Sequence, residues 1–284
     1  MFIQIYHEKY MRFPCGKAKA LTFSYDDGVS ADIKLIALLD KYGLKGTFNL
    51  NSKLFDCPEW HGRLDEEQTF KTYSGGEHEV ALHGARHIFL NKVSLPEAVK
   101  EVADNRTYLE DKFGKIVRGM AYAYNGYNAD IKRVIADMGV AYARTTEATY
   151  GFSIPEDWLQ LNPTCHHRDK QFTPLADKFF KNSPLKEFKH REPWLFYLWG
   201  HAYEFDDDNN WEMIEDFCRR AAEQSDEIWF ATNIQIYEYV KAYNNLVFSL
   251  DGERVYNPSA IPVWIEVRGK NYEIEAGATI SFNK

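Results

Sequence analysis

The sequence predicts an α/β protein in which seven or eight βα units form a parallel barrel, followed by a short β-rich extension. Short apolar runs alternate with amphipathic helical patterns from about residue 18 to residue 243, as βα units require. The length of 284 residues is normal for one such barrel with an extension. After Asn244 the helical periodicity gives way to short β-patterned runs broken by Asp-Gly, Asn-Pro and Gly, a pattern typical of hairpins.

Eight apolar runs are predicted as strands, because they are rich in β-branched and aromatic residues and are bounded by turn formers. They span residues 20–25, 46–50, 79–83, 116–124, 140–146, 158–164, 194–200 and 228–233. The connection from the sixth to the seventh run is long and irregular. We therefore expect the barrel to be distorted at that point.

Helical periodicity and capping residues predict the connections between these strands. The predicted helices span residues 30–43, 94–114, 128–139, 211–224 and 234–243. Ser94 and Glu97 have the spacing of a capping box at the start of the second helix. We accordingly divide the chain into a barrel over residues 1–243 and a β-hairpin extension over 244–284 that packs on the barrel.

Composition excludes several classes of partner and predicts a compartment. The net charge of −8 argues against nucleic acid or an anionic membrane as the main partner, and no apolar stretch is long enough to span a bilayer. The four cysteines are scattered without a CxxC pair, so no disulfide framework is expected. No signal peptide is seen, which predicts a cytoplasmic protein; export of a form lacking its leader is the alternative. The sequence does not predict the oligomeric state.

Acidic and imidazole groups follow several of the predicted strands. Asp26 and Asp27 end the first strand, His83 and His87 follow the third, and His201 follows the seventh. The carboxyl ends of barrel strands meet at one rim, which is where such barrels carry their functional groups. Each signal alone is common, since Asp-Asp-Gly is an ordinary turn and a single histidine is usually structural. Their joint placement at one rim is what predicts a site.

The residue types at this rim suit metal-assisted hydrolysis. Two histidines four residues apart and one carboxylate give three N/O ligands and leave open positions for water and substrate. The second carboxylate is then free to act as a base.

The same residues carry a resemblance to a known family. "TFSYDDG" at 22–28 resembles the TFDDG motif of the polysaccharide deacetylases, the NodB homology or carbohydrate esterase 4 family, and "HEVALHGARH" at 78–87 resembles their H-[ST]-x-x-H motif with its lead-in. Three further segments are looser matches. They are "KGTFNLN" at 45–51, "MAYAYNGYN" at 120–128 and "LWGHAYEF" at 198–205. The resemblance covers about residues 18–242.

The resemblance implies the family's distorted barrel and a metal-dependent hydrolase acting on carbon–nitrogen bonds other than peptide bonds. The expected reaction is removal of acetyl groups, N-acetyl above all, from a sugar or oligosaccharide, with water on the metal attacking the acetyl carbonyl. The resemblance implies that Asp27, His83 and His87 bind one divalent metal, expected to be zinc. It implies that Asp26 is the general base and His201 the general acid, and that the backbone N–H of Tyr124 stabilises the oxyanion.

The sequence departs from the family pattern at several positions. Gly84 stands where the family has Ser or Thr, and Ala121 stands where it has the arginine that braces the base. Arg118 lies three positions before Ala121 and should face the other way by strand alternation. Arg144, at the end of the neighbouring predicted strand, is our candidate replacement, with a plain surface arginine as the alternative. Asp157-Trp158 has the letters of the family's fourth motif but precedes the sixth predicted strand, and "TCHH" at 164–167 occupies the motif's place. We add His166 and Glu204 as candidate residues around the substrate, with plain surface positions as the alternative for His166.

Three other functions stay open at this point. Within enzymes, the alternatives are an O-acetyl esterase and a hydrolase of a non-sugar cyclic amide. Outside enzymes, the alternative is a catalytically inactive carbohydrate-binding module. The presence of both a base and an acid beside the ligand set argues against the inactive module, because binding alone needs neither.

Overall fold

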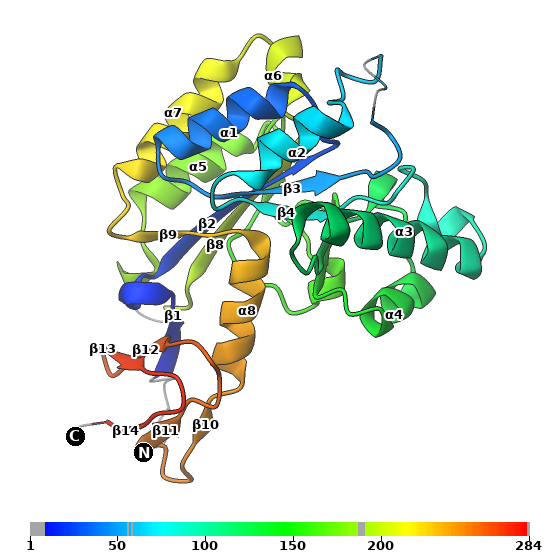
Figure 1. Cartoon of the computed structure of the whole chain (residues 1–284). Helices are drawn as coiled ribbons and strands as arrows, with labels where there is room; N and C mark the ends of the chain where they lie inside the picture. Colours follow the sequence, from blue (N-terminus) through cyan, green and yellow to red (C-terminus); the bar gives the residue numbers. More distant parts are fainter. Residues whose placement is uncertain (1–8, 56, 58, 187–190, 283–284) are drawn as a thin grey trace.

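The computed structural model describes residues 9–55, 57, 59–186 and 191–282. Its centre is a curled parallel sheet with the strand order β6-β5-β4-β3-β2-β8-β7, and β9 pairs with β2 beside this path (Figure 1). The strands are β2 (Lys19–Asp26), β3 (Gly46–Leu50), β4 (Glu79–Leu82), β5 (Gly119–Ala121), β6 (Tyr142–Arg144), β7 (Cys165–His166), β8 (Trp194–Gly200) and β9 (Ile228–Phe230). This is the expected distorted barrel.

Strand β2 organises the sheet, and all eight of its residues are buried. Its register pairs Lys19–Tyr25 with β8, whereas β3 pairs only with Phe23–Asp26 and β9 with Lys19–Leu21. Strands β3 and β9 therefore share one edge of β2, one after the other. Its apolar and aromatic residues, followed by the Asp-Asp-Gly turn, are what identifies this strand in the sequence.

The predicted strand at 158–164 is wrong. Trp158–Gln160 form a 3₁₀ helix, η4, and the strand that follows is the short β7. Asn162-Pro163 explains the difference, because proline has no N–H for a ladder and restricts the residue before it. The backbone still closes the curled sheet: Thr145 N–H donates to Leu161 O over 3.0 Å, and Thr164 N–H donates to Tyr197 O over 2.9 Å.

Eight α-helices are found in the described part of the chain. They are α1 (Ala31–Lys41), α2 (Glu66–Ser74), α3 (Leu95–Phe113), α4 (Ala129–Asp137), α5 (Phe172–Lys181), α6 (Tyr203–Asp207), α7 (Trp211–Ala222) and α8 (Asn233–Asn244). The sequence missed α2, α5 and α6. It also predicted a capping box that does not form, since the Ser94 side chain makes no capping hydrogen bond. Among the described residues no helix has the length and apolar character to cross a bilayer.

The C-terminal region forms two small antiparallel sheets beyond the N-terminal ends of β2 and β8 (Figure 1). One has the order β1-β12-β13, from β1 (Lys9–Arg12), β12 (Val263–Val267) and β13 (Lys270–Ile274). The other has the order β10-β11-β14, from β10 (Val247–Phe248), β11 (Arg254–Tyr256) and β14 (Thr279–Ser281). Since β1 comes from the start of the chain, the division at residues 243 and 244 stays a prediction.

Candidate active site

The carboxyl ends of β2, β4 and β8 bring five of the predicted residues together. Asp26 is the last residue of β2, and Asp27 follows it with a positive φ of 86°. Successive side chains of a regular strand point to opposite faces, but this left-handed residue breaks the alternation. Both carboxylates consequently approach the same ring: His83 Nε2 lies 3.7 Å from Asp26 Oδ2 and 3.8 Å from Asp27 Oδ1.

Asp27, His83 and His87 have the geometry of a ligand set. The Nε2 atoms of the two histidines are 3.1 Å apart, and His87 Nε2 is 3.6 Å from Asp27 Oδ1. Donors bound to one zinc ion at its usual distances lie about 3.3 Å from each other. His83 Nδ1 lies 3.0 Å from the carbonyl oxygen of Ala121, so Nδ1 holds the proton and Nε2 offers a lone pair. Burial, with the neighbouring His83, lowers the pKa of His87 to about 4 and keeps its imidazole neutral. These donors fit a divalent metal.

The loop that holds the two histidines is braced by a carboxylate in place of the missing hydroxyl. Gly84 has a φ of 78°, and a Cβ there would lie 3.2 Å from Glu101 Oε1. That oxygen accepts the backbone N–H of Arg86 over 2.5 Å, and Glu101 Oε2 accepts Arg86 Nε over 2.9 Å. The space that a Ser or Thr side chain would need at position 84 is therefore taken by Glu101 of α3.

Asp26 is fixed by a buried guanidinium. Arg144 Nη2 donates to Asp26 Oδ2, and Asn49 Nδ2 donates to Asp26 Oδ1 over 2.8 Å. Burial raises the pKa of Asp26, but Arg144, together with His83 and His201, outweighs this effect and brings the pKa to about 2. The guanidinium itself lies over the Trp199 ring, 4.4 Å from its centroid. Arg118 takes no part, since it pairs with Glu238 on the surface.

Asp27 has a partner that the sequence did not indicate. Arg63, in the loop after β3, donates from Nη2 to Asp27 Oδ1 over 2.7 Å and from Nη1 to Asn51 Oδ1 over 2.8 Å. Burial alone would raise the pKa of Asp27. The neighbouring His83 and Arg63 lower it by more, so the pKa of Asp27 lies below its ordinary value. No motif marks Arg63, because it lies 36 residues from its partner in a long irregular loop.

His201 lies between the carboxylates of Asp27 and Glu204. Its Nε2 is 3.9 Å from Asp27 Oδ2, and its Nδ1 is 3.4 Å from Glu204 Oε2. Burial lowers the pKa of His201, but Glu204, Asp26 and Asp27 together raise it above the ordinary value. His166, the other candidate, lies next to Glu204, with its Nε2 3.1 Å from Oε2. Both added candidates therefore lie on the far side of His201 from the ligand set.

Tyr124 is in the 3₁₀ turn η3 (Ala123–Asn125), with a φ of 54°. Its ring meets the His87 ring edge-on at a centroid distance of 4.4 Å and stacks on Phe89 at 4.4 Å. The side chain is 55 % exposed. The Tyr124 ring is thus next to a candidate ligand, and the role of its backbone N–H stays a prediction.

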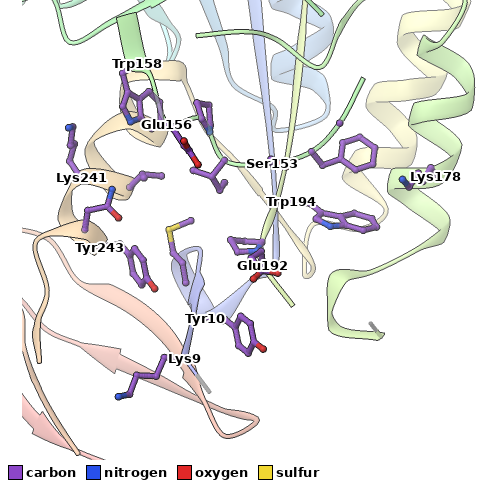
Figure 2. A pocket seen from close by; sticks show the side chains of 18 residues that line it. Lys9, Tyr10, Ser153, Glu156, Trp158, Lys178, Glu192, Trp194, Lys241 and Tyr243 are labelled. Carbon is purple, nitrogen blue, oxygen red and sulfur yellow. The ribbon is translucent and has the colours of Figure 1, made fainter. Parts of the chain in front are cut away.

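The letters of the fourth motif lie elsewhere. Asp157 forms an ion pair with Lys132, and Trp158 lines a cavity of about 950 Å³ beside β1, α8 and the start of β8 (Figure 2). Trp194, the first residue of β8, lines the same cavity, whereas His201 follows the last residue of that strand. None of the described residues that line the cavity is His or Asp. It therefore lacks the imidazoles and aspartates of the candidate ligand set.

Comparisons with known proteins agree with the motifs. Residues 13–143 match the sequence profile of the polysaccharide deacetylase family. No curated protein matches the chain. A candidate polysaccharide deacetylase from Mycobacterium smegmatis is 16% identical with a TM-score of 0.58, over 83% of this chain and 94% of that one. The D285S mutant of the peptidoglycan deacetylase PdaC from Bacillus subtilis is 19% identical with a TM-score of 0.51, over 80% and 93%.

A third solved structure with this fold, PuuE allantoinase, is 11% identical with a TM-score of 0.59, over 79% of this chain and 91% of that one. At these identities the three structures establish the fold alone. Together with the profile match they confirm the resemblance to the polysaccharide deacetylases. That match supports a hydrolase of the deacetylase type.

Proposed function

We propose that the chain is a metal-dependent deacetylase that hydrolyses the N-acetyl group of a sugar or oligosaccharide. One observation supports this above all: two adjacent carboxylates at the end of β2 have different partners. Asp27 lies with His83 and His87 in a ligand arrangement, whereas Asp26 lies with Arg144 and Asn49. Different partners give the two carboxylates different tasks.

Asp27, His83 and His87 would hold the metal, and imidazole with carboxylate is a donor set that suits zinc. When bound, such an ion supplies Lewis-acid chemistry, which polarises a carbonyl and lowers the pKa of water. Arg63 fixes the Asp27 side chain and keeps it ionised. The carbonyl of Ala121 fixes the His83 tautomer that leaves Nε2 free.

Asp26 acts as the general base that takes the proton from the attacking water. Its ion pair with Arg144 keeps it deprotonated at neutral pH and holds one carboxylate oxygen in place. The backbone N–H of Tyr124 contributes to stabilising the oxyanion that develops on the acetyl carbonyl.

His201 acts as the general acid for the leaving amine. Its Nε2 faces Asp27, and neighbouring carboxylates favour its protonated form. An amine leaves poorly unless it is protonated, so a cationic imidazole beside the reacting carbon provides what amide hydrolysis needs. Ester hydrolysis needs this proton less, which is why N-acetyl substrates come first in the proposal.

Acetate release from a panel of substrates tests the proposal. The protein loaded with zinc is incubated with N-acetylated sugars, O-acetylated sugars and a cyclic amide, and again after chelation. We expect acetate from the N-acetyl sugars, loss of activity on chelation and recovery on adding zinc. Faster turnover of the O-acetyl sugars or of the cyclic amide would assign the chain to one of the alternatives. Sugar binding without turnover of any substrate would assign it to the inactive module.

A further inference from the structure

A second cluster of imidazoles surrounds one carboxylate oxygen next to the candidate active site. Oε2 of Glu204 lies 3.1 Å from His166 Nε2, 3.2 Å from His167 Nε2 and 3.4 Å from His201 Nδ1. We call these four residues the Glu204 cluster. His167 is fully buried at its side chain and Glu204 nearly so. Three of the members, His166, His201 and Glu204, are close enough to bind a metal ion.

The hydrogen bonds around His166 argue against a metal in the Glu204 cluster. The backbone N–H of Arg168 donates to His166 Nδ1 over 3.0 Å. A nitrogen that accepts an N–H has no proton of its own, so the neutral ring has its proton on Nε2 and directs it at Glu204. A metal ligand needs the opposite arrangement, as in His83, where Nδ1 faces a carbonyl. The two imidazole clusters of this chain therefore serve different purposes.

The local backbone aims Glu204 at His201. The N–H of Glu204 donates to His201 O over 3.2 Å, and the N–H of His201 donates back to Glu204 Oε2 over 3.0 Å. This reciprocal pair over three residues fixes the turn that leads into α6. The same oxygen lies 3.4 Å from His201 Nδ1 without the alignment of a hydrogen bond, and Nδ1 has no other hydrogen-bond partner among the described residues.

We propose that Glu204 is the positioning residue of His201: it accepts the Nδ1 proton, fixes the ring and leaves Nε2 as the atom that faces the substrate. This inference rests on the function proposed above for His201. A neutral imidazole holds one proton, and the carboxylate decides which nitrogen holds it.

Arg168 offers a matched control for Glu204. It donates to the other oxygen, Oε1, over 3.1 Å and to Asp208, and so it helps to anchor α6 without meeting the His201 ring. Arg168→Gln removes this anchor but keeps the acceptor of His201. Glu204→Leu removes the acceptor, and Glu204→Gln keeps an oxygen without the charge.

The test compares the three variants, loaded with zinc, on an N-acetyl sugar and on an aryl acetate, whose phenolate leaves without a proton. We expect Glu204→Leu to lower kcat on the N-acetyl sugar by about 100-fold or more, with the aryl acetate within about threefold. Glu204→Gln should keep much more of the N-acetyl activity than Glu204→Leu, and Arg168→Gln should be close to wild type on both substrates. In wild type, nitrogen-15 NMR should find the His201 proton on Nδ1 when the ring is neutral, and Glu204→Leu should remove that preference.

Equal losses on both substrates, or a wild-type His201 with its neutral proton on Nε2, would overturn the proposal. So would a second zinc ion per chain that Glu204→Leu abolishes. A wild-type protein that hydrolyses aryl acetates but no N-acetyl sugar would instead refute the proposed function. The NMR measurement does not depend on turnover, so the two failures are distinguishable.

Discussion

The guanidinium of Arg144, at the end of β6, and the carboxylate of Asp26, at the end of β2, form a buried ion pair. Their side chains are 1% and 4% exposed, and 117 residues of chain separate them. The family's arginine would come from position 121 on β5, which here is alanine. Because β6 lies next to β5 in the sheet, a long side chain from the neighbouring strand reaches the same carboxylate.

Arg144→Gln should destabilise the fold and slow the reaction. Removing one partner of a buried pair leaves an uncompensated charge, which costs about 3–5 kcal/mol. The control is Arg118→Gln, because Arg118 pairs with Glu238 at a half-exposed site, and such pairs contribute about 0–1 kcal/mol. Denaturant unfolding measures the free energy of unfolding of both variants. Adding Asp26→Asn to Arg144→Gln should recover part of the lost stability; if the double variant is less stable than Arg144→Gln, the pair is not what Arg144 stabilises.

His83→Ala should abolish metal binding. In the proposed ligand set this ring supplies one of three donors, and the Ala121 carbonyl fixes its tautomer. His78→Ala is the matched control, since His78 is also buried but accepts the backbone N–H of Gly46 and pairs with Asp40. Elemental analysis of the purified proteins after loading with zinc gives the answer. One zinc per chain in His83→Ala would remove that residue from the ligand set.

Asp26→Asn should keep the metal and lose most of the activity. Asparagine has the shape of aspartate but cannot take a proton, and a positioned general base contributes about 10²–10⁴-fold. Asp27 is held by its own partner, Arg63, so the substitution at Asp26 leaves Asp27 in place. Steady-state kinetics beside zinc analysis separates the roles, and near-normal kcat with full metal content would refute the base.

His201→Ala should impair amide substrates far more than activated esters. The leaving amine needs a proton, whereas a phenolate does not. We expect a loss of about 100-fold or more on N-acetyl sugars and a small change on aryl acetates. Equal losses on the two substrates would show that His201 positions or binds rather than donates the proton.

The sequence indicated the rim well because strand ends and short motifs determine it. Asp26, Asp27, His83, His87 and His201 each lie within a few residues of a recognisable strand, and parallel strands bring their carboxyl ends together. The resemblance supplied their expected roles. Arg144 could be suggested for the same reason, since it ends the strand next to the one that lacks the arginine.

The sequence did not indicate the supporting contacts, because these depend on loops and on distant pairs. Arg63 reaches Asp27 from an irregular segment, and the buried side chain of Glu101 in α3 fills the space at Gly84. The strand predicted at 158–164 was wrong because the prediction followed the apolar pattern and did not take into account that Pro163 has no backbone N–H to donate. Strand β1 escaped prediction because its partner, β12, lies some 250 residues away.

One buried acid outside the site should make the stability of the fold depend on pH. Asp32, in the first turn of α1, is fully buried. Its Oδ2 accepts the Tyr73 hydroxyl over 2.5 Å and the Val29 N–H over 3.2 Å, while Oδ1 has no partner among the described residues. Burial outweighs these hydrogen bonds and raises the pKa of Asp32 to about 7.

Between about pH 4 and pH 7 the folded chain therefore keeps a proton on Asp32 that the unfolded chain has released, because an unfolded aspartate has a pKa of about 3.9. The folded state binds more protons in this window, so the free energy of unfolding falls as pH rises, by up to ~1.4 kcal/mol per unit and about 4 kcal/mol in all. Asp32→Asn should remove this decline and make the protein more stable than wild type at pH 7.5.

Asp130→Asn is the control, since Asp130 is in the first turn of α4 but exposed. Urea unfolding of the three proteins at pH 4.5, 6 and 7.5 measures the slopes. A wild-type slope that Asp32→Asn leaves unchanged would mean that Asp32 is already ionised in the fold, with Tyr73 and Val29 satisfying its charge.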